Sequence, residues 1–355
     1  MERASAYLVQ IKLKIDILDK VMPRGRPTRQ QVFQSLDEAR RDLNIIGGLP
    51  EPTVFQDVWA DIWIEETHNS TAIEGNTLRR KQIQLLLEEG VVTGSAHELK
   101  EWMEAKAYGE AARWTYEGAY RGRFQNGNAI TEPDLRRIHH LTVESVWVHF
   151  PPEGLRSDET PGAYRTGDIE PLRPDLTPPP PSLVASLVGD WLKETNDDPP
   201  SDCHIIEHLA ERHAAFERIH PFPDGNGRAG RLVLTMLLVQ NGYPPAIIYK
   251  GERKRYLAAL QRADEGDPGA LAELVARSVR EGIYRFLMPN LAGPLSIVPL
   301  AGLADAELSR AALVGAAQRG RLKANKFGGN WYSTRQWVDE YKAGRHPGRS
   351  LPNPA

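Results

Sequence analysis

The stretch from His220 to Arg231, with the sequence His-Pro-Phe-Pro-Asp-Gly-Asn-Gly-Arg-Ala-Gly-Arg, constrains the fold of this chain more than any other feature. An apolar run from Leu232 to Val239, interrupted only by Thr235, follows it directly. The pattern predicts a glycine-containing loop that leads into the N-terminus of a buried helix. Unpaired backbone N–H groups and the helix dipole make such an end an anion site, and glycine lets a phosphate approach the main chain closely. We therefore expect this loop to bind phosphates.

The side chains of the same stretch suit phosphate chemistry. Asp224 offers a carboxylate to Mg²⁺, which proteins commonly hold through one or two carboxylates together with the phosphates of the substrate. Arg228 and Arg231 can each donate paired hydrogen bonds to phosphate oxygens. His220 has an unperturbed pKa near neutrality, so it can take a proton from an attacking hydroxyl. The alternative is a glycine-rich turn that caps a core helix and is flanked by solvated arginines.

The pattern His-x-Phe-x-Asp-Gly-Asn-Gly-Arg-x-x-Arg resembles the signature of the Fic (filamentation induced by cAMP) family. Eight of twelve positions are fixed, and each residue type has an average usage of a few per cent, so chance does not explain the match. The usual members of the family transfer AMP. The resemblance implies an all-α, Fic-fold enzyme that moves AMP from ATP to a Ser, Thr or Tyr hydroxyl of a target protein and releases pyrophosphate.

The resemblance also implies a role for each polar residue of the stretch. His220 is expected to be the catalytic base, and Asp224 the ligand of Mg²⁺. The residues expected to bind ATP phosphates are Gly225, Asn226, Gly227, Arg228 and Arg231. Positioned donors and a metal ion are the usual means by which phosphate-transferring enzymes lower their barrier.

Residues 61–76 read as a helix that stops at Gly75, since glycine is a common signal at helix C-termini. Glu74 then lies in the last turn, where the helix dipole disfavours a carboxylate and favours a cationic partner. Ser70 lies one turn earlier, and the pattern Ser-x-x-x-Glu-Gly resembles the inhibitory motif of many Fic proteins. The resemblance implies that Glu74 pairs with Arg231, blocks the γ-phosphate site and restrains the enzyme. The alternative is a solvated glutamate near a helix end.

Residues 162–170 and the proline-rich residues 171–181 do not suit a helix. A long irregular loop inside a domain is usually functional or disordered. The segment resembles the Fic flap, a short β-hairpin beside the active site, which implies that it holds a target segment by strand-like main-chain pairing. The alternative is a plain surface loop. The expected docking residues are Tyr164, Arg165, Thr166, Gly167, Asp168 and Ile169.

Residues 249–267 resemble the downstream segment of the family, whose tyrosine and asparagine approach the adenosine. Tyr256 matches the first of these and Asp264 stands at the second, so the resemblance places both on the nucleoside side. An aspartate in place of the asparagine departs from the family pattern. This departure leaves the nucleotide preference open.

The boundaries follow from changes in pattern and composition. We expect a helical N-terminal region over 1–125 with the inhibitory helix at about 61–76, a Fic core over 126–290, a linker over 291–300 and a small module over 301–349. The residues expected to pack in the core of the N-terminal region include Trp102, Met103 and Trp114.

The module over 301–349 carries nine basic and four acidic side chains, a charge of +5, whereas the whole chain carries −3. Its pattern reads as a helix over 307–319, a β-hairpin over 322–333 and a helix over 334–341. This order resembles a small winged helix-turn-helix module. DNA contact by its helix and wing is one expectation, and protein contact that forms a homodimer is the other.

Composition narrows the class of protein. With one cysteine, Cys203, the chain can form neither an internal disulfide nor a cysteine-based zinc site. The N-terminus lacks a signal-peptide pattern, and the longest apolar run is too short to cross a bilayer. We therefore expect a cytoplasmic protein without membrane contact.

Three other functions remain open. Glu74 could position a water, so that the enzyme removes AMP from a modified protein. The fold could sense a nucleotide while residues 301–349 bind DNA. The transferred group could also be a phosphate or another nucleotide moiety.

Overall fold

The computed structural model describes residues 27–45, 48–53, 55–92, 98–122, 129–170, 176–288, 298–305, 307–327 and 330–345. The chain forms two compact units: Arg29–Gly282, and Ile283–Ala355 together with Met1–Thr28. Residues 1–26, for which a helix is expected, and linker residues 291–297 lie outside the described residues.

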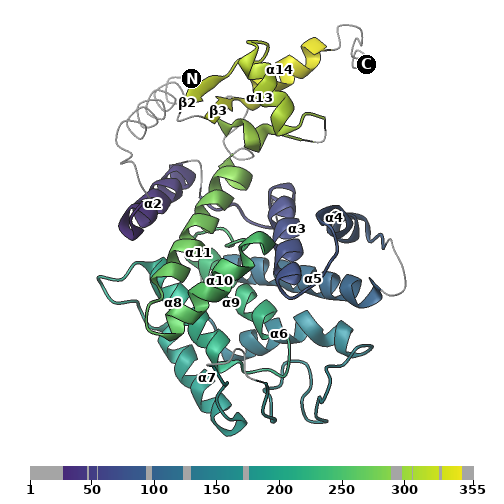
Figure 1. The fold of residues 1–355 in the computed structure, drawn as a ribbon, viewed down its shortest axis with the longest axis vertical. Helices are drawn as coiled ribbons and strands as arrows, with labels where there is room; N and C mark the ends of the chain where they lie inside the picture. The colour runs from purple at the N-terminus through teal and green to yellow at the C-terminus, as the bar shows by residue number, and fades with distance from the viewer. Residues whose placement is uncertain are drawn as a thin grey trace. The chain divides into compact units, whose positions relative to one another are not determined.

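The larger unit is helical (Figure 1). Its helices are α2 (Arg29–Ile45), α3 (Gln56–Ile73), α4 (Arg80–Glu89), α5 (Leu99–Gly122), α6 (Glu132–Trp147), α7 (Pro181–Asn196), α8 (Ile205–Ile219), α9 (Asn226–Gln240), α10 (Arg253–Asp264) and α11 (Gly269–Gly282), with the 3₁₀ turn η2 at Lys250–Glu252. No β-strand is assigned to the part of this unit that the structure describes, as the all-α class predicts.

Helix α9 is the centre of the larger unit. It packs against α5, α6 and α8, and every residue from Arg228 to Val239 is buried. A helix that is apolar all round belongs in a core, which is why the run after the glycine-containing loop forms this element. The loop is therefore attached to the most buried helix of the unit.

Local signals account for several helix ends. Thr131 caps α6, because its Oγ1 accepts a hydrogen bond from Asp134 N at 3.3 Å and Pro133 stands in the first turn. Helix α7, which the sequence patterns did not indicate, begins at the last proline of the proline-rich segment. Trp102 is 2% exposed as expected, but the core assignment of Trp114 is wrong, since Trp114 is 37% exposed.

A buried carboxyl joins three helices of this unit. Glu66 on α3 accepts hydrogen bonds from Tyr108 on α5 at 3.1 Å, from Thr235 on α9 at 3.0 Å and from the hydroxyl of Tyr116 on α5. Burial raises the pKa of Glu66 to about 7, although the three hydroxyls favour the charged form. The Glu66 network thereby fixes α3 against α5 and α9.

The smaller unit contains the π-helical turn η3 (Ile283–Leu287), strand β1 (Val298–Pro299), the 3₁₀ turn η4 (Leu300–Leu303), helix α13 (Arg310–Gln318), strands β2 (Asn325–Phe327) and β3 (Asn330–Ser333) and helix α14 (Arg335–Arg345). The strands form an antiparallel sheet in the order β1-β3-β2. Its core residues are Leu300, Leu303, Leu308, Leu313, Ala316, Ala317, Leu322 and Val338.

The order of helix, hairpin and helix in the smaller unit is the expected one. The assignment of residues 298–300 to a linker is wrong, because Val298 and Pro299 pair with Ser333 and Tyr332 and Leu300 packs in the core. A winged helix-turn-helix identity stays a prediction. Among the helices that the structure describes, none combines the length and hydrophobicity needed to cross a bilayer.

The Glu66 network predicts a pH-dependent stability. A carboxyl whose pKa is raised from 4.5 to about 7 contributes stability that is complete below pH 4.5 and is lost as pH rises through 7. Glu66→Gln removes this titration. We expect the stability of the wild type to fall relative to Glu66→Gln, by at most about 3 kcal/mol, between roughly pH 5 and pH 8.

Urea unfolding of both proteins across this pH range measures the difference. A difference that does not change with pH contradicts a raised pKa for Glu66.

Candidate active site

The glycine-containing loop connects α8 to α9 and requires two left-handed residues. His220, which ends α8, has φ = 50° and is the one non-glycine residue with positive φ in the described ranges. Gly225, which caps α9, has φ = 83°, and a Cβ there would lie 2.8 Å from Val143 Cγ1. Glycine is therefore needed at position 225 for both conformation and space.

The Asn226 side chain closes the loop. Its Oδ1 accepts from Phe222 N at 2.9 Å and its Nδ2 donates to Phe222 O at 2.7 Å. The side chain is therefore already hydrogen-bonded, and any phosphate contact of Asn226 is expected from its backbone N–H at the start of α9.

His139 on α6 packs against the loop and hydrogen-bonds to it, a role that the sequence did not indicate. Its ring stacks on Phe222 with centroids 3.8 Å apart, its Nδ1 accepts from Gly162 N at 2.9 Å, and its Nε2 lies 2.8 Å from Asp224 O. Because Nδ1 accepts a hydrogen bond, the proton is on Nε2 and the ring is neutral. Burial lowers the pKa of His139 to about 3, which agrees with this assignment.

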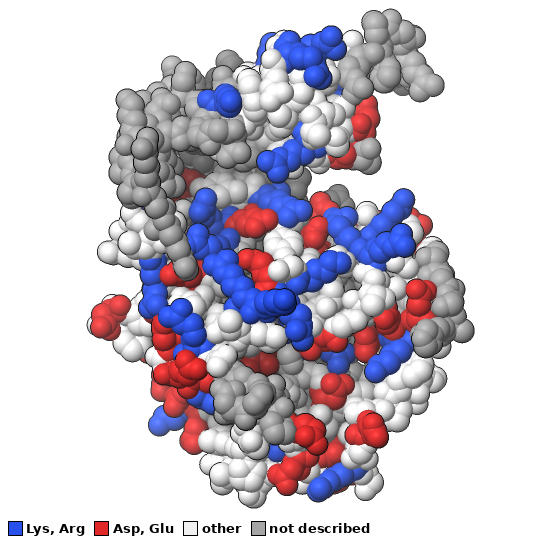
Figure 2. Space-filling view, viewed as in Figure 1, with Lys and Arg blue, Asp and Glu red and all other residues white. Residues whose placement is uncertain are grey.

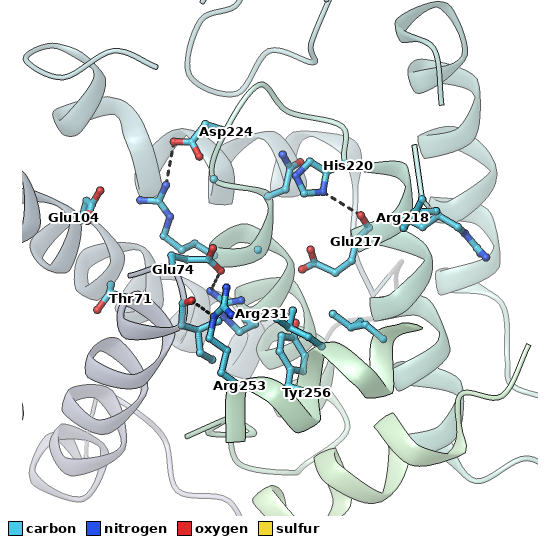
Figure 3. Close-up of a pocket in the computed structure, with 18 of the residues that line it drawn as sticks. Thr71, Glu74, Glu104, Glu217, Arg218, His220, Asp224, Arg231, Arg253 and Tyr256 are labelled. Carbon is cyan, nitrogen blue, oxygen red and sulfur yellow. Dashed lines mark hydrogen bonds and ion pairs between the residues drawn. The ribbon is translucent and has the colours of Figure 1, made fainter. Parts of the chain in front are cut away.

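His220 is arranged as a base. Its Nδ1 lies 3.1 Å from Glu217 O, so Nδ1–H donates to this carbonyl and Nε2 keeps a free lone pair (Figure 3). Burial lowers the pKa of His220, the hydrogen bond to Glu217 O partly offsets this, and the Arg165 guanidinium lowers it further. The ring is consequently neutral at neutral pH and can accept a proton.

Arg165 joins the flap to the glycine-containing loop that follows α8. Its Nε donates to His220 O at 2.8 Å, and its backbone N donates to Pro221 O at 2.9 Å. Its remaining guanidinium contacts are Pro179 O at 2.5 Å, Gly167 O at 3.3 Å and Ile219 O at 3.4 Å. Arg165 is 2% exposed, so its side chain is unavailable for docking a target.

The flap differs from the expected hairpin in its described part. Residues 161–170 carry no strand assignment, and residues 171–175 are not described. The N–H groups of Thr166 and Gly167 donate to Glu159 Oε1 at 2.7 and 3.0 Å. The main-chain pairing expected at these two residues is therefore already satisfied within the loop.

The remaining docking residues differ in exposure. Asp168 is exposed and Ile169 is half-buried. The Tyr164 ring is half-buried and lies beneath the Arg136 guanidinium at 3.9 Å. Target docking by this segment stays a prediction that now falls mainly on residues 168–169.

Glu74 and Arg231 are in contact, as the sequence predicts (Figure 3). Glu74 is the C-cap of α3, and its Oε1 accepts from Arg231 Nη2 at 2.7 Å. Arg231 also donates to Ser70 Oγ at 2.8 Å and to Ser70 O at 3.0 Å. Burial alone would raise the pKa of Glu74, but Arg231 holds this pKa below its ordinary value, so the pair is charged.

The Glu74 carboxylate also lies over the first turn of α9. A Cβ at Gly227 would come 2.5 Å from Glu74 Oε1 and 3.1 Å from Arg231 Nη1. Glu74 thus occupies the end of α9 at which a phosphate is expected.

These side chains surround a pocket of about 470 Å³, a size typical of small-ligand sites. Asp224 contributes a half-exposed carboxylate, of which Oδ2 accepts from Arg228 Nη2 at 3.2 Å. The part of the chain that the structure describes holds no group of three His, Cys, Asp or Glu residues fit for a metal.

The far wall of the pocket comes from α10. Tyr256 is 1% exposed and its hydroxyl lies 2.7 Å from His213 Nε2, while Asp264 Oδ1 lies 3.9 Å from Arg218 Nη1. Both residues line the pocket, as expected for the nucleoside side. Glu217, which also lines it, was not predicted, although it stands three residues before His220 on the same helix face.

Basic side chains gather around the start of α10 on the face of the larger unit shown in Figure 2. The exposed members are Lys250, Arg253, Lys254 and Arg255. Arg253 lines the pocket, and its Nε donates to Ile73 O at 2.8 Å. A positive rim of this kind attracts polyanions such as nucleotides.

Comparisons with known proteins relate this chain to one family. Residues 129–238 match the model of the Fic/DOC family. The chain is 27% identical over 293 residues to the "Protein adenylyltransferase Fic" of Nematostella vectensis, covering 81% of this chain and 63% of that protein. It is 30% identical over 272 residues to the protein of the same name from Culex quinquefasciatus, covering 76% of this chain and 50% of that protein. The chain thus spans about half to two thirds of the length of these relatives.

Solved structures show the same fold. A structure of Fic-1 from C. elegans is 26% identical, with a TM-score of 0.58, and covers 73% of this chain and 71% of that chain. A Fic domain containing signaling protein from Bacteroides thetaiotaomicron is 22% identical, with a TM-score of 0.55, and covers 72% of this chain and 95% of that chain.

The Arg165 contacts predict a measurable effect on His220. Arg165→Gln removes a cation next to the ring, so we expect the pKa of His220 to rise. Arg165→Lys keeps the charge and is expected to leave the pKa closer to that of the wild type. An NMR titration of the His220 ring measures both variants.

Arg156→Gln is the matched control, because Arg156 is an exposed arginine that precedes the flap and donates to the flap carbonyl Thr166 O at 2.8 Å. An unchanged His220 pKa in Arg165→Gln would show that the guanidinium does not act on the ring.

Proposed function

We propose that this chain, whose residues 129–238 match the Fic/DOC family model, is a protein adenylyltransferase that transfers AMP from ATP to a Ser, Thr or Tyr hydroxyl of a protein. The observation that carries the proposal is the position of a neutral imidazole, His220, in the wall of a pocket that also contains the N-terminus of α9. A base and an anion site in one pocket are what phosphoryl chemistry requires.

The reaction follows from this arrangement. Nε2 of His220 takes the proton of the target hydroxyl as its oxygen forms a bond to the α-phosphorus of ATP. The bond from the α-phosphorus to the bridging oxygen breaks, and pyrophosphate leaves with the electron pair. The N–H groups at the start of α9 and the Arg228 guanidinium stabilise the charge on the phosphate oxygens.

Mg²⁺ is part of the proposal. The residue to hold it is Asp224, whose half-exposed carboxylate lines the pocket and retains an oxygen that does not face Arg228. A bound Mg²⁺ neutralises phosphate charge. The chain's own contribution is to hold Asp224, since His139 contacts its backbone carbonyl and Arg228 donates to Oδ2 of its carboxylate.

The enzyme is restrained by Glu74 in this proposal. Arg231 is buried, and its Nε and Nη2 donate to Ser70 and Glu74, so a γ-phosphate has to displace these contacts before it can use the guanidinium. Glu74 also covers Gly227 at the start of α9. Loss of the Glu74 carboxylate therefore frees both the Arg231 guanidinium and the start of α9 at Gly227 for an anion.

Two expectations about partners stay predictions. The names of the relatives above refer to protein adenylyltransferases and not to DNA binding, so contact with DNA through residues 301–349 has no further support. The prediction of a homodimer likewise has no further support.

Self-modification tests the proposal. With Mg²⁺ and ATP labelled at the α-phosphate, we expect weak labelling of the wild type and strong labelling of Glu74→Gly. Glu74→Gly/His220→Ala is expected to lose roughly 100-fold or more, because a positioned base contributes about that factor. Glu89→Gly, which removes an exposed glutamate at the end of α4, is the matched control and should label like the wild type.

Other outcomes identify the alternatives. A Glu74→Gly protein that binds ATP and stays unlabelled contradicts transfer to itself. Release of free AMP from labelled protein in the absence of ATP indicates hydrolysis with Glu74 as the water-positioning group. The mass of the adduct distinguishes AMP from phosphate or another nucleotide moiety.

A further inference from the structure

Glu217 is a pocket residue to which the proposed reaction gives no side-chain role. It stands one turn before His220 on α8, and its side chain is 14% exposed. Its Oε1 is shielded from solvent and has no hydrogen-bond partner among the described residues. The nearest basic ring, His213, lies 4.0 Å away, and burial lowers the pKa of His213 to about 3, so the two form no ion pair.

The Glu217 carboxyl lies against Gly230 on α9. A Cβ at Gly230 would come 2.4 Å from Glu217 Oε1 and 2.9 Å from Phe216 Cδ1. Only glycine at position 230 leaves room for the carboxyl. A buried polar group without a partner costs free energy, so a group held in this way calls for an explanation, such as a ligand that supplies the missing donor.

The two ends of the pocket differ in chemistry. At one end lie the N-terminus of α9, Arg228 and His220, where the phosphates of a nucleotide are stabilised. At the other end α10 contributes Tyr256, Leu257 and Leu260, an aromatic and apolar wall that suits a nucleobase. A nucleotide bound in this direction has its sugar between the two ends.

Glu217 lies between these ends. Figure 3 shows its side chain between His220 and Tyr256, with the carboxyl directed toward the middle of the pocket. Burial raises the pKa of Glu217 to about 7, although the nearby Arg231 guanidinium favours the charged form, so the carboxylate predominates only above neutral pH. Once charged, Glu217 interacts electrostatically with the Tyr256 hydroxyl and with the Arg231 guanidinium. A carboxylate repels phosphate, so the part of a nucleotide that suits this position is a neutral hydrogen-bond donor.

We propose that Glu217 accepts a hydrogen bond from a ribose hydroxyl and thereby selects ribonucleotides over deoxyribonucleotides. The 2′ and 3′ hydroxyls are the neutral donors that a nucleotide carries between its α-phosphate and its base, and an acidic side chain is a known partner for such hydroxyls. This inference rests on the proposed function, because it requires a nucleotide in the pocket.

Binding of ATP, 2′-deoxy-ATP and 3′-deoxy-ATP, measured by calorimetry with Mg²⁺ present, tests the inference. Glu74→Gly, which opens the pocket, is the reference protein. We expect at least one deoxy analogue to bind it about 10-fold more weakly than ATP, the usual size for a lost hydrogen bond to a charged group. In Glu74→Gly/Glu217→Ala the same analogue should bind within about twofold of ATP.

Two further variants test whether the discrimination between ATP and its deoxy analogues depends on the Glu217 carboxylate itself. Glu217→Gln preserves shape and one acceptor oxygen and should discriminate at an intermediate level. Glu211→Ala, which removes an exposed glutamate from the same helix, should discriminate like the reference. Urea unfolding of each variant shows whether a weak binder is also a poorly folded one.

The outcomes separate the two proposals. Equal discrimination with and without Glu217, while ATP binds both proteins, overturns the role of Glu217 and leaves the proposed function intact. Failure of all three nucleotides to bind Glu74→Gly overturns the proposed function and this inference with it.

Discussion

The ion pair between Arg231 and Glu74 is the interaction that decides whether the pocket can offer the Arg231 guanidinium to a phosphate. Arg231 is 6% exposed on the most buried helix of the larger unit, and a buried guanidinium needs an anionic partner. In the structure that partner is Glu74, and Ser70 satisfies further donors. A nucleotide that uses Arg231 must therefore displace the end of α3, and a protein without Glu74 offers a buried cation to any phosphate that enters.

Three buried anchors hold the surroundings of this pair. Glu66 ties α3 to α5 and α9, His139 holds the carbonyl of Asp224, and Arg165 holds the carbonyl of the left-handed His220. His139 and Arg165 act at the loop that leads into α9, and Glu66 acts further along α9, at Thr235. Such support places the base and the anion site before any ligand arrives, which is how enzymes avoid reorganisation during the reaction.

Much of the site could be predicted because its signals are local. The spacing of His220, Asp224 and the two arginines, and the glycine after Glu74, lie within short stretches in which helix ends and dipoles decide the geometry. The cap that Thr131 provides at the start of α6 is a signal of the same local kind. The all-α class came from the resemblance that the short motif from His220 to Arg231 carries.

The rest depends on contacts between distant segments. The roles of Arg165 and His139 depend on their hydrogen bonds to the carbonyls of residues 220 and 224. No local sequence pattern predicts contacts between such distant residues. The Asn226 side chain was expected to bind phosphate. Its hydrogen bonds to the backbone of Phe222 depend on the three-dimensional course of the loop, which the sequence pattern does not show. Trp114 looked like a core residue for a similar reason, since a helix pattern does not say which face stays exposed.

A thermodynamic cycle on the central ion pair tests the account most directly. ATP affinity is measured with Mg²⁺ for the wild type, Glu74→Gly, Arg231→Ala and the double variant. We predict that Glu74→Gly binds ATP more tightly than the wild type and that this gain shrinks strongly when Arg231 is absent. Equal ATP affinities of the wild type and Glu74→Gly would contradict the central claim that Glu74 competes with the nucleotide for Arg231.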